Sequence, residues 1–578
     1  MSSEFEVYNE DLFEGHFINN SSEIVNDTLL GIIASNPKVG ILNCGNVIVC
    51  RNYANENIVK VISGGPSGHE PFQAGFVGKG MLSAAVQGEI FHSPYVSMIL
   101  KAIKEISYNL TAGVLVIVQN NISDCLKFGL AVERARNQGI TIEMLVVNDD
   151  FCVINKHQGK RGMSGIVLIT KIAGAMAERL LSLKTIYQFC QKVLENMTSI
   201  SFSLRMCSRV DECVCTTQHN SFEIEIGTGL HGEKGLLVLD EINTKEVASF
   251  LITQLSNGFP INDTVPVVIL VNNLGQSLLL EEMTFVKEVT NCLQECHKVN
   301  VARAFRGKFL TSPKIKGFSL TILNIFDDLV LKYLDDSCEA TGWGYMSTIP
   351  IERNLFPILC RSIKRKQVTS LGPRLTPQQC NAVYYALQFA SDALISCEKQ
   401  LNIIDSDGKR DIGTKMKRGA VIVLELMKNR RIDFSHPKCW FAVLSHIAER
   451  FVGGAVGSFY SILFEVASTY FGDLSEDLYI DFQVWLKCFE EAIIIIKRYG
   501  RTEFGFGTMY DPLFACLQTL NMFPEQNKCM ESFRLSLKYV EDAVFQTKRD
   551  SRKHVDPGAE VVRIWLQAIY EGLSLRYN

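Results

Sequence analysis

The chain has 578 residues, of which 47% are hydrophobic and 21% charged, and a formal net charge of −4. This length exceeds what one hydrophobic core accommodates, so we expect two to four domains of a soluble globular protein. The small net charge and the lack of a basic tail argue against a nucleic-acid-binding protein. No apolar run approaches the ~18 residues that a membrane span needs. The acidic N-terminus "MSSEFEVYNEDLFEGHF" is unlike a signal peptide, so we expect a cytoplasmic protein.

The 18 cysteines are expected to be mostly reduced and buried. No CxxC pair occurs, and the nearest approach to metal-ligand spacing is Cys207, Cys213 and Cys215 in "CSRVDECVC". This cluster lacks a second paired half, so ordinary cysteines are favoured over zinc ligands there.

Short apolar runs alternate with amphipathic stretches in the first half of the chain. The predicted strands are "VKVISG" (59–64), "GVLVIVQN" (113–120) and "IEMLVVND" (142–149), and the clearest helix is "SDCLKFGLAVERARNQG" (123–139). This alternation is typical of an α/β fold with parallel strands. Further strands at 265–275 and 318–325 indicate a second α/β unit over roughly residues 190–340.

The pattern changes after about residue 346. Residues 346–375 carry prolines and a basic cluster without a clean period, which indicates a linker. Thr376 is a suitable N-cap with Pro377 at the first helical position, and helical periods then continue to the end of the chain. We therefore expect a multidomain protein, with two α/β units followed by an all-α bundle or barrel over 376–578.

Three polar stretches of the first half each carry one candidate catalytic residue. "VISGGPSGHEP" (61–71) leads from a strand through glycines to His69 at the start of an expected helix, where backbone N–H groups can meet a ligand and an imidazole can transfer protons. Asp124 in "VQNNISDCLKFGLA" begins the next helix, at the strand edge where open α/β sheets bind ligands. His231 lies among glycines in "EIEIGTGLHGEKG", where a neutral imidazole can attack a small carbonyl compound. Taken singly, a capped turn at His69 and an N-cap aspartate at Asp124 are the favoured explanations, and a glycine-rich hairpin with an incidental histidine is the alternative for His231.

Together these stretches resemble the dihydroxyacetone kinase family. The match includes "SGGPSGHEPFQAGFVGKGML", "NNISDCLKFGLAVERAR", "KRGMSGIVLITKIAGAMAE" and "FLTSPKIKGFSLTILN", in the family's order, and extends over about residues 5–575. It is closest to the single-chain, ATP-dependent form, whose animal members are triokinase/FMN cyclases. The resemblance implies a dihydroxyacetone-binding domain over 5–345, with two subunits split near 185–195, and an ATP-binding domain over 376–578.

The resemblance also implies roles for residues of the first half. His231 would hold dihydroxyacetone as a covalent hemiaminal, which only a ketone or aldehyde can form, so glycerol would be excluded. His69 and Asp124 would be the acid/base pair beside the hydroxyl that receives phosphate, and Ser67 and Gly68 would cradle the substrate. Two positions depart from the family: Pro66 replaces a third glycine and removes a backbone N–H, and Gln119 replaces a lysine.

In the family's all-α half, three aspartates hold magnesium and ATP. "LNIIDSDGKRDIGTKMKRGA" (401–420) matches the flanks of that loop, with Asp405 and Asp411 at the first and last aspartates. Lys409 takes the middle place, and Asp407 is the residue that a different loop path would bring there. The other expected nucleotide contacts are Arg410, Ile412, Val456, Gly457, Gly507, Thr508, Asp556, Pro557 and Gly558. Val456 replaces a serine, and "GFGTMYDPL" (505–513) lacks an acid and an arginine of the family pattern.

The implied function is transfer of the γ-phosphate of Mg-ATP to dihydroxyacetone or glyceraldehyde by a homodimer. Animal members also split FAD into cyclic FMN and AMP in the same nucleotide site. The alternative is a pseudoenzyme that keeps the fold and binds a ketose or a protein partner, because Pro66, Lys409 and Val456 alter the sites. A regulator that binds nucleotide without metal is a third interpretation.

Overall fold

The computed structural model describes residues 17–577, except for 21, 44, 52, 54–55, 153–158, 207–221, 232, 241, 262, 314, 345–369, 406–410, 501, 524–527 and 549–553. Its contacts divide the chain into two compact units, Met1–Ile358 and Leu359–Asn578. Cys207, Cys213 and Cys215 and most of the predicted linker lie outside the described residues. The cysteines within the described part are free thiols, and several of them are buried. The domain boundaries drawn from the sequence stay predictions.

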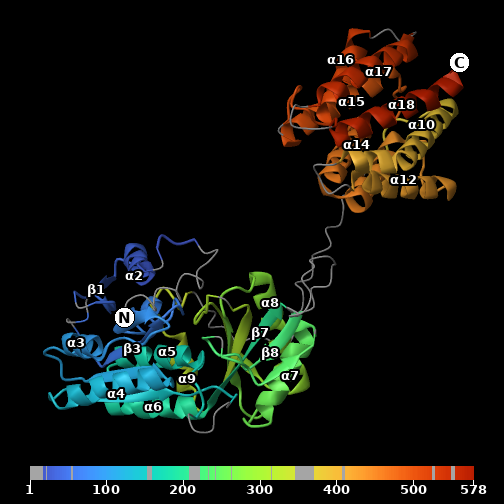
Figure 1. The fold of residues 1–578 in the computed structure, drawn as a ribbon. Helices are drawn as coiled ribbons and strands as arrows, with labels where there is room; N and C mark the ends of the chain where they lie inside the picture. Colours follow the sequence, from blue (N-terminus) through green and yellow to red (C-terminus); the bar gives the residue numbers. More distant parts are fainter. Residues whose placement is uncertain are drawn as a thin grey trace, which may run out of the picture. The chain divides into compact units, whose positions relative to one another are not determined.

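The first unit contains two six-stranded sheets (Figure 1). The strands of the first sheet are β1 (Val39–Ile41), β2 (Val47–Cys50), β3 (Lys60–Ser67), β4 (Ala84–Ile90), β5 (Val114–Gln119) and β6 (Ile142–Val147), in the order β1-β2-β4-β3-β5-β6. Pairing is parallel from β4 through β3 and β5 to β6, and antiparallel between β1, β2 and β4. The parallel strands predicted from the apolar runs are confirmed.

Helices cover both faces of this sheet because side chains alternate along a strand. Val114 and Val116 of β5 pack in one cluster with α3 (Val96–Ile106) and α4 (Ile122–Arg136). Leu115 and Ile117 pack on the other face with α5 (Gly165–Glu178) and α6 (Leu183–Glu195). The helix predicted at 123–139 is therefore confirmed as α4. A further helix, α2 (Ile24–Ser35), precedes β1.

The second sheet has the order β11-β10-β12-β7-β8-β9. Its strands are β7 (Met197–Met206), β8 (Phe222–Ile226), β9 (Leu237–Leu239), β10 (Val267–Asn273), β11 (Val301–Gly307) and β12 (Gly317–Asn324). Among the described strands of this sheet, β10 and β11 pair in parallel and the other neighbours pair antiparallel, a pairing on which the sequence made no prediction. The loop 227–236 between β8 and β9, for example, is too short for a crossover helix and so joins antiparallel neighbours. Helices α7 (Thr244–Ser256) and α8 (Leu279–Asn291) cover its outer face, and η3 (Cys292–Cys296) and α9 (Leu329–Asp335) complete the unit.

Helix α5 connects the two sheets. Its residues from Gly165 to Ala177 are buried, and it contacts β3 and β5 of the first sheet and β7 of the second. Gly174 permits this packing, because a Cβ atom there would overlap the backbone of Met81. Since the sheets share this helix, loops from both of them reach one candidate site.

The second unit is helical, as predicted. Its helices are α10 (Pro377–Ser396), α11 (Glu398–Ile404), α12 (Ile412–Lys428), α13 (Pro437–Ile447), η4 (Ala448–Val452), α14 (Gly454–Asp473), α15 (Phe482–Gly500), α16 (Tyr510–Met522), α17 (Cys529–Gln546) and α18 (Pro557–Tyr577). The Thr376 side chain accepts a hydrogen bond from the backbone N–H of Gln379, and the Gln379 side chain accepts one from the backbone N–H of Thr376, so the predicted N-cap is confirmed. In the described residues, we find no helix with the length and apolar character that crossing a bilayer requires.

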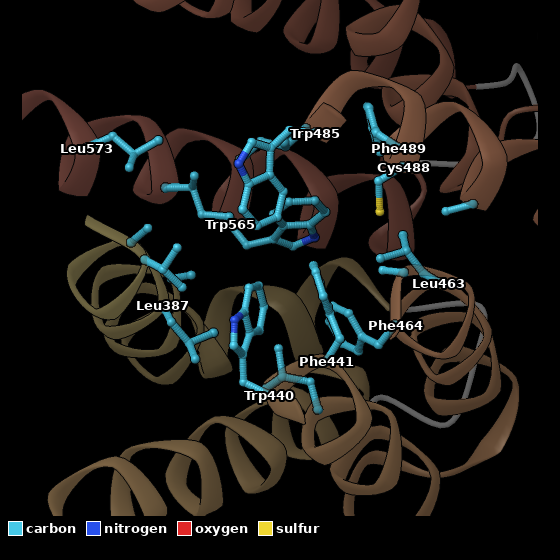
Figure 2. Close-up of a pocket in the computed structure, with 18 of the residues that line it drawn as sticks. Leu387, Trp440, Phe441, Leu463, Phe464, Trp485, Cys488, Phe489, Trp565 and Leu573 are labelled. Carbon is cyan, nitrogen blue, oxygen red and sulfur yellow. The ribbon is translucent and has the colours of Figure 1, made fainter. Parts of the chain in front are cut away.

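These helices surround an apolar cavity of about 1000 Å³ (Figure 2). Its lining includes Leu387, Trp440, Phe441, Leu463, Phe464, Trp485, Cys488, Phe489, Trp565 and Leu573. None of the expected nucleotide contacts that the structure describes is among the lining residues. A nucleotide site at those contacts would therefore be separate from the cavity.

Candidate active site

Strand β3 ends in a bulge at the glycine-rich stretch. Gly65 pairs with Gln87 and Ser67 with Ile90, which leaves Pro66 without a partner on β4. A proline is tolerated at such a position because no ladder hydrogen bond is lost. The Ser67 hydroxyl donates to the carbonyl oxygen of Gly88 at 2.7 Å, so this side chain is used within the protein.

The α-helix expected at His69 is absent; bends and turns follow β3 before a short 3-10 helix at Ala74–Phe76. The reason is a set of long-range contacts that take the backbone groups of the loop. The His69 carbonyl accepts from the backbone N–H of Thr311 at 3.2 Å, and the Glu70 carbonyl accepts from the Thr311 hydroxyl at 2.7 Å. Gly68 has φ +103°, and a Cβ there would lie 3.1 Å from the Phe91 ring, so the turn needs glycine.

Thr311 also orients the His69 ring. It belongs to the loop between β11 and β12, and its carbonyl oxygen lies 2.7 Å from Nδ1 of His69. Because a carbonyl can only accept, Nδ1 carries the proton and Nε2 of a neutral His69 carries the lone pair. Asn272 holds the same loop: its Oδ1 accepts from the backbone N–H groups of Phe309 and Leu310, both at 2.9 Å.

The two candidate histidines are in direct contact. Nε2 of His69 lies 3.1 Å from Nε2 of His231, with the rings nearly perpendicular, and the Phe91 ring packs against both. His231 comes from the β8–β9 loop, so the site joins the ends of both sheets. Because Nε2 of neutral His69 carries a lone pair, this contact is a hydrogen bond when Nε2 of His231 carries the proton. A ligand that binds between the rings would replace this contact and meet a nucleophilic nitrogen.

Glu233 holds His231 from the other side. Its carboxylate accepts from the backbone N–H of His231 at 2.9 Å, and its second oxygen lies 3.5 Å from Nδ1. Burial raises the pKa of Glu233, but the hydrogen bonds from His231 and the backbone outweigh burial and bring it to about 2. The resulting anion stabilises the form of His231 with its proton on Nδ1, and in that form Nε2 no longer donates to His69 and is free to attack.

Burial also sets the charge states of His69 and Asp124. It lowers the pKa of His69 to about 4, with a further contribution from the neighbouring His231. It raises the pKa of Asp124 to about 6, against the opposing effects of a Ser93 hydrogen bond and of His231 and Lys127. His69 is therefore neutral and Asp124 ionised at neutral pH.

Asp124 is not the N-cap of α4. That role belongs to Asn121, whose side chain accepts from the backbone N–H of Ser123. Asp124 lies in the first turn and is buried, and its Oδ1 has no hydrogen-bond partner. Gln119, at the end of β5, donates to the carbonyl oxygens of Gly162 and Met163, both at 3.3 Å. The Gln119 amide therefore holds Gly162 and Met163, just before α5, and brings no positive charge to the site.

In the helical unit, the structure describes Asp405 and Asp411 but not Asp407, Lys409 or Arg410. Asp405 accepts from the backbone N–H groups of Asp411 at 3.0 Å and Ile412 at 3.4 Å, and Asp411 forms an ion pair with Lys415 at 2.9 Å. Within the described part of the chain, no group of three or more His, Cys, Asp or Glu residues could hold a metal ion. The three-aspartate magnesium site stays a prediction.

The remaining expected nucleotide contacts lie at loops and helix starts. Helix α14 begins after Gly453 and Gly454, whose φ angles are +67° and +63°. Val456 packs in the same hydrophobic cluster as Ile412 and Met509, which brings these loops to one end of the unit. A Cβ at Gly457 would lie 2.5 Å from the carbonyl oxygen of Ala448, so this glycine is required for helix packing.

In two of these loops, polar groups form hydrogen bonds within the protein. The N–H groups of Gly507 and Thr508 donate to the buried carboxylate of Asp511 at 2.7 and 3.0 Å. Asp556 accepts from the N–H of Ala559 at 2.9 Å at the start of α18, with Pro557 in its first turn. A Cβ at Gly558 would lie 3.3 Å from Cβ of Met509, which places α18 against the same cluster.

The sequence did not single out Glu233, Thr311 or Asn272. Glu233 had a signal, since it follows His231 by two residues in the same glycine-rich loop. Thr311 contacts His69, 242 positions away, and Asn272 holds the Thr311 loop through Phe309 and Leu310, 37 and 38 positions away, and no local pattern marks such contacts.

Comparisons with known proteins match one family domain to each half of the chain. Residues 30–342 match the Dak1 domain and residues 406–571 the DAK2 domain. The chain is 31% identical to triokinase/FMN cyclase of Bos taurus over 96% of this chain and 98% of that one, and 29% identical to dihydroxyacetone kinase of Citrobacter freundii over 96% and 99%. The crystal structure of the C. freundii kinase with AMP-PNP and Mg²⁺ superposes with a TM-score of 0.73 at 28% identity, covering 96% of this chain and 99% of that one. The chain belongs to the dihydroxyacetone kinase family.

Proposed function

We propose that this chain is an ATP-dependent kinase that phosphorylates dihydroxyacetone held on His231. The observation that carries the proposal is the 3.1 Å contact between His69 and His231. It brings a candidate nucleophile and a candidate proton carrier together from two separate sheets. The animal relatives are named triokinase/FMN cyclase, and the bacterial and yeast relatives dihydroxyacetone kinase.

In this proposal Nε2 of His231 attacks the carbonyl carbon of the substrate. A C–N bond forms, the carbonyl π bond breaks, the oxygen takes a proton, and Nδ1 of His231 releases one, so that a neutral hemiaminal forms with no net change in protons. Asp124, ionised at neutral pH, accepts the proton of the hydroxyl that receives phosphate, and His69 completes the acid/base pair. Glycerol has no carbonyl group and cannot form the adduct. Glyceraldehyde has one and is the alternative substrate.

We propose ATP as the phosphate donor and magnesium as its cofactor, since the related C. freundii structure contains AMP-PNP and Mg²⁺. The N–H groups in the first turn of α14, which begins at Gly454 with Gly453 as N-cap, suit phosphate oxygens. Asp405 and Asp411 both have partners within the protein, so the described residues alone do not make a magnesium site. A bound magnesium ion would neutralise phosphate charge in this reaction.

FAD is a second candidate substrate for the same nucleotide site, because relatives at 30–31% identity carry FMN cyclase in their names. Incubation with FAD and a divalent cation, followed by chromatography, tests this activity through the appearance of cyclic FMN and AMP. The homodimer expected from the family is a separate proposal, which light scattering at micromolar concentration tests.

A coupled kinase assay tests the main proposal. With Mg-ATP we expect turnover of dihydroxyacetone and none of glycerol, and loss of turnover in His231→Ala. His297→Ala, which removes a histidine at the end of η3, is the matched control and should keep the activity. Binding of dihydroxyacetone without turnover in the unmodified protein would overturn the kinase proposal and favour the pseudoenzyme alternative.

A further inference from the structure

Two buried side chains meet over Gly65 with oxygens that have no partner. Gln73 is 1% exposed and Asp124 is 2% exposed. Oε1 of Gln73 and Oδ1 of Asp124 make no hydrogen bond within the protein. Gln73 lies in the His69 loop and Asp124 in the first turn of α4, so two separate elements bring these oxygens to one place.

The geometry at Gly65 shows how close the two groups are. A Cβ atom there would lie 2.9 Å from Nε2 and 3.7 Å from Oε1 of Gln73, and 3.5 Å from Oδ2 of Asp124. The absence of a side chain at Gly65 therefore lets the Gln73 amide lie against the backbone, next to the Asp124 carboxylate. Gln87, the register partner of Gly65 on β4, is fully buried and also has an unpaired Oε1.

Unpaired buried acceptors are unusual, because leaving one without a donor destabilises the fold. These acceptors lie beside residues that the proposed function assigns to substrate binding. A ligand that donates hydrogen bonds would satisfy them, and a hydroxyl group is the donor that a small ketose supplies.

We propose that Gln73 is a specificity-determining residue whose Oε1 accepts a hydrogen bond from a substrate hydroxyl lying over Gly65. The inference rests on the proposed function, since it takes the substrate to be a hydroxylated ketone or aldehyde. Dihydroxyacetone has two hydroxyls: one pairs with Asp124 and the other with Gln73. Hydroxyacetone has one, so it leaves one of the two acceptors unpaired and binds more weakly.

The test compares two ligands on two proteins. Isothermal titration of the unmodified protein should give at least tenfold tighter binding of dihydroxyacetone than of hydroxyacetone. Gln73→Met keeps the length of the side chain without its polar atoms, and should reduce that ratio to about threefold or less. Gln138→Met, at the exposed end of α4, is the control and should leave the ratio unchanged.

Thermal unfolding separates this role from a structural one. If Gln73 serves the ligand, Gln73→Met removes an unpaired buried acceptor, and the midpoint of thermal unfolding stays the same or rises. The inference is overturned if Gln73→Met keeps the tenfold ratio of the two affinities. A clearly lower unfolding temperature together with that unchanged ratio would show that Gln73 has a structural role. If the unmodified protein binds neither ligand, the proposed function fails and this inference falls with it.

Discussion

Glu233 decides which nitrogen of His231 is free to react. Its carboxylate faces Nδ1 at 3.5 Å and accepts the backbone N–H of His231, and Gly229 leaves room for it because a Cβ there would overlap its oxygen. A neutral amide loses the preference for a proton on Nδ1. We expect Glu233→Gln to weaken dihydroxyacetone binding about tenfold, the effect of roughly one charge-assisted hydrogen bond. Titration calorimetry measures this, with Asp240→Asn at the end of the same hairpin as the control; equal affinities in both variants would contradict the role.

The pH dependence of the reaction follows from the two buried groups. The pKa of Asp124 is raised to about 6 by burial, so this base is ionised above pH 6 and protonated below it. The pKa of His69 is lowered to about 4 by burial, so its ring stays neutral over the same range. We expect kcat/KM for dihydroxyacetone to fall about tenfold per pH unit below a midpoint near 6. A profile that stays flat down to pH 4.5 would show that Asp124 does not act as the base.

The sequence predicted the candidate catalytic residues but not the residues that orient them. His69, Asp124 and His231 stand out because each follows a strand or lies among glycines. The contact that orients His69 comes from Thr311, and neither its residue type nor its neighbours mark it. Positions outside the described residues, such as Lys409, remain predictions from the family pattern alone.

Among the elements, α5 depends on a single glycine. Gly174 packs against the backbone of Met81, which cannot move aside as a side chain can. We expect Gly174→Ala to lower the free energy of unfolding of the first unit by about 1–3 kcal/mol, the usual cost of overpacking. Gly129→Ala in α4 is the matched control, because a Cβ there meets nothing within 4 Å, and it should stabilise by about 0.5–1 kcal/mol. Urea unfolding of both variants measures the difference, and equal stabilities would contradict the packing argument.

The strands and α4 were predictable because their hydrophobic periods are local. The helix expected after His69 was not formed, since Thr311 takes the carbonyls of His69 and Glu70. The pairing of the second sheet could not be predicted, because apolar runs show where strands lie and not which direction their neighbours take. Both the missing helix and the unpredicted pairing depend on contacts between distant parts of the chain.

For the whole molecule, the open question is how fast phosphate is transferred. Lys409 stands where the family carries an aspartate, and an ammonium group repels magnesium. We expect Lys409→Asp to increase kcat at least threefold without changing dihydroxyacetone binding, since that site lies in the first unit. If the unmodified protein already turns over at about 1–100 s⁻¹, as kinases do, and Lys409→Asp slows it, Lys409 is a phosphate ligand instead. Lys399→Asp, on α11, serves as the control for charge.

Capture of the substrate carbonyl by His231 is the central claim, and ¹³C NMR tests it most directly. Dihydroxyacetone labelled at its carbonyl carbon is mixed with the unmodified protein, without nucleotide, and the resonance of that carbon is followed. The account predicts a new protein-bound signal of a tetrahedral carbon, present in His297→Ala and absent in His231→Ala. A bound carbonyl signal that stays trigonal in the unmodified protein, or a tetrahedral signal that persists in His231→Ala, would contradict it.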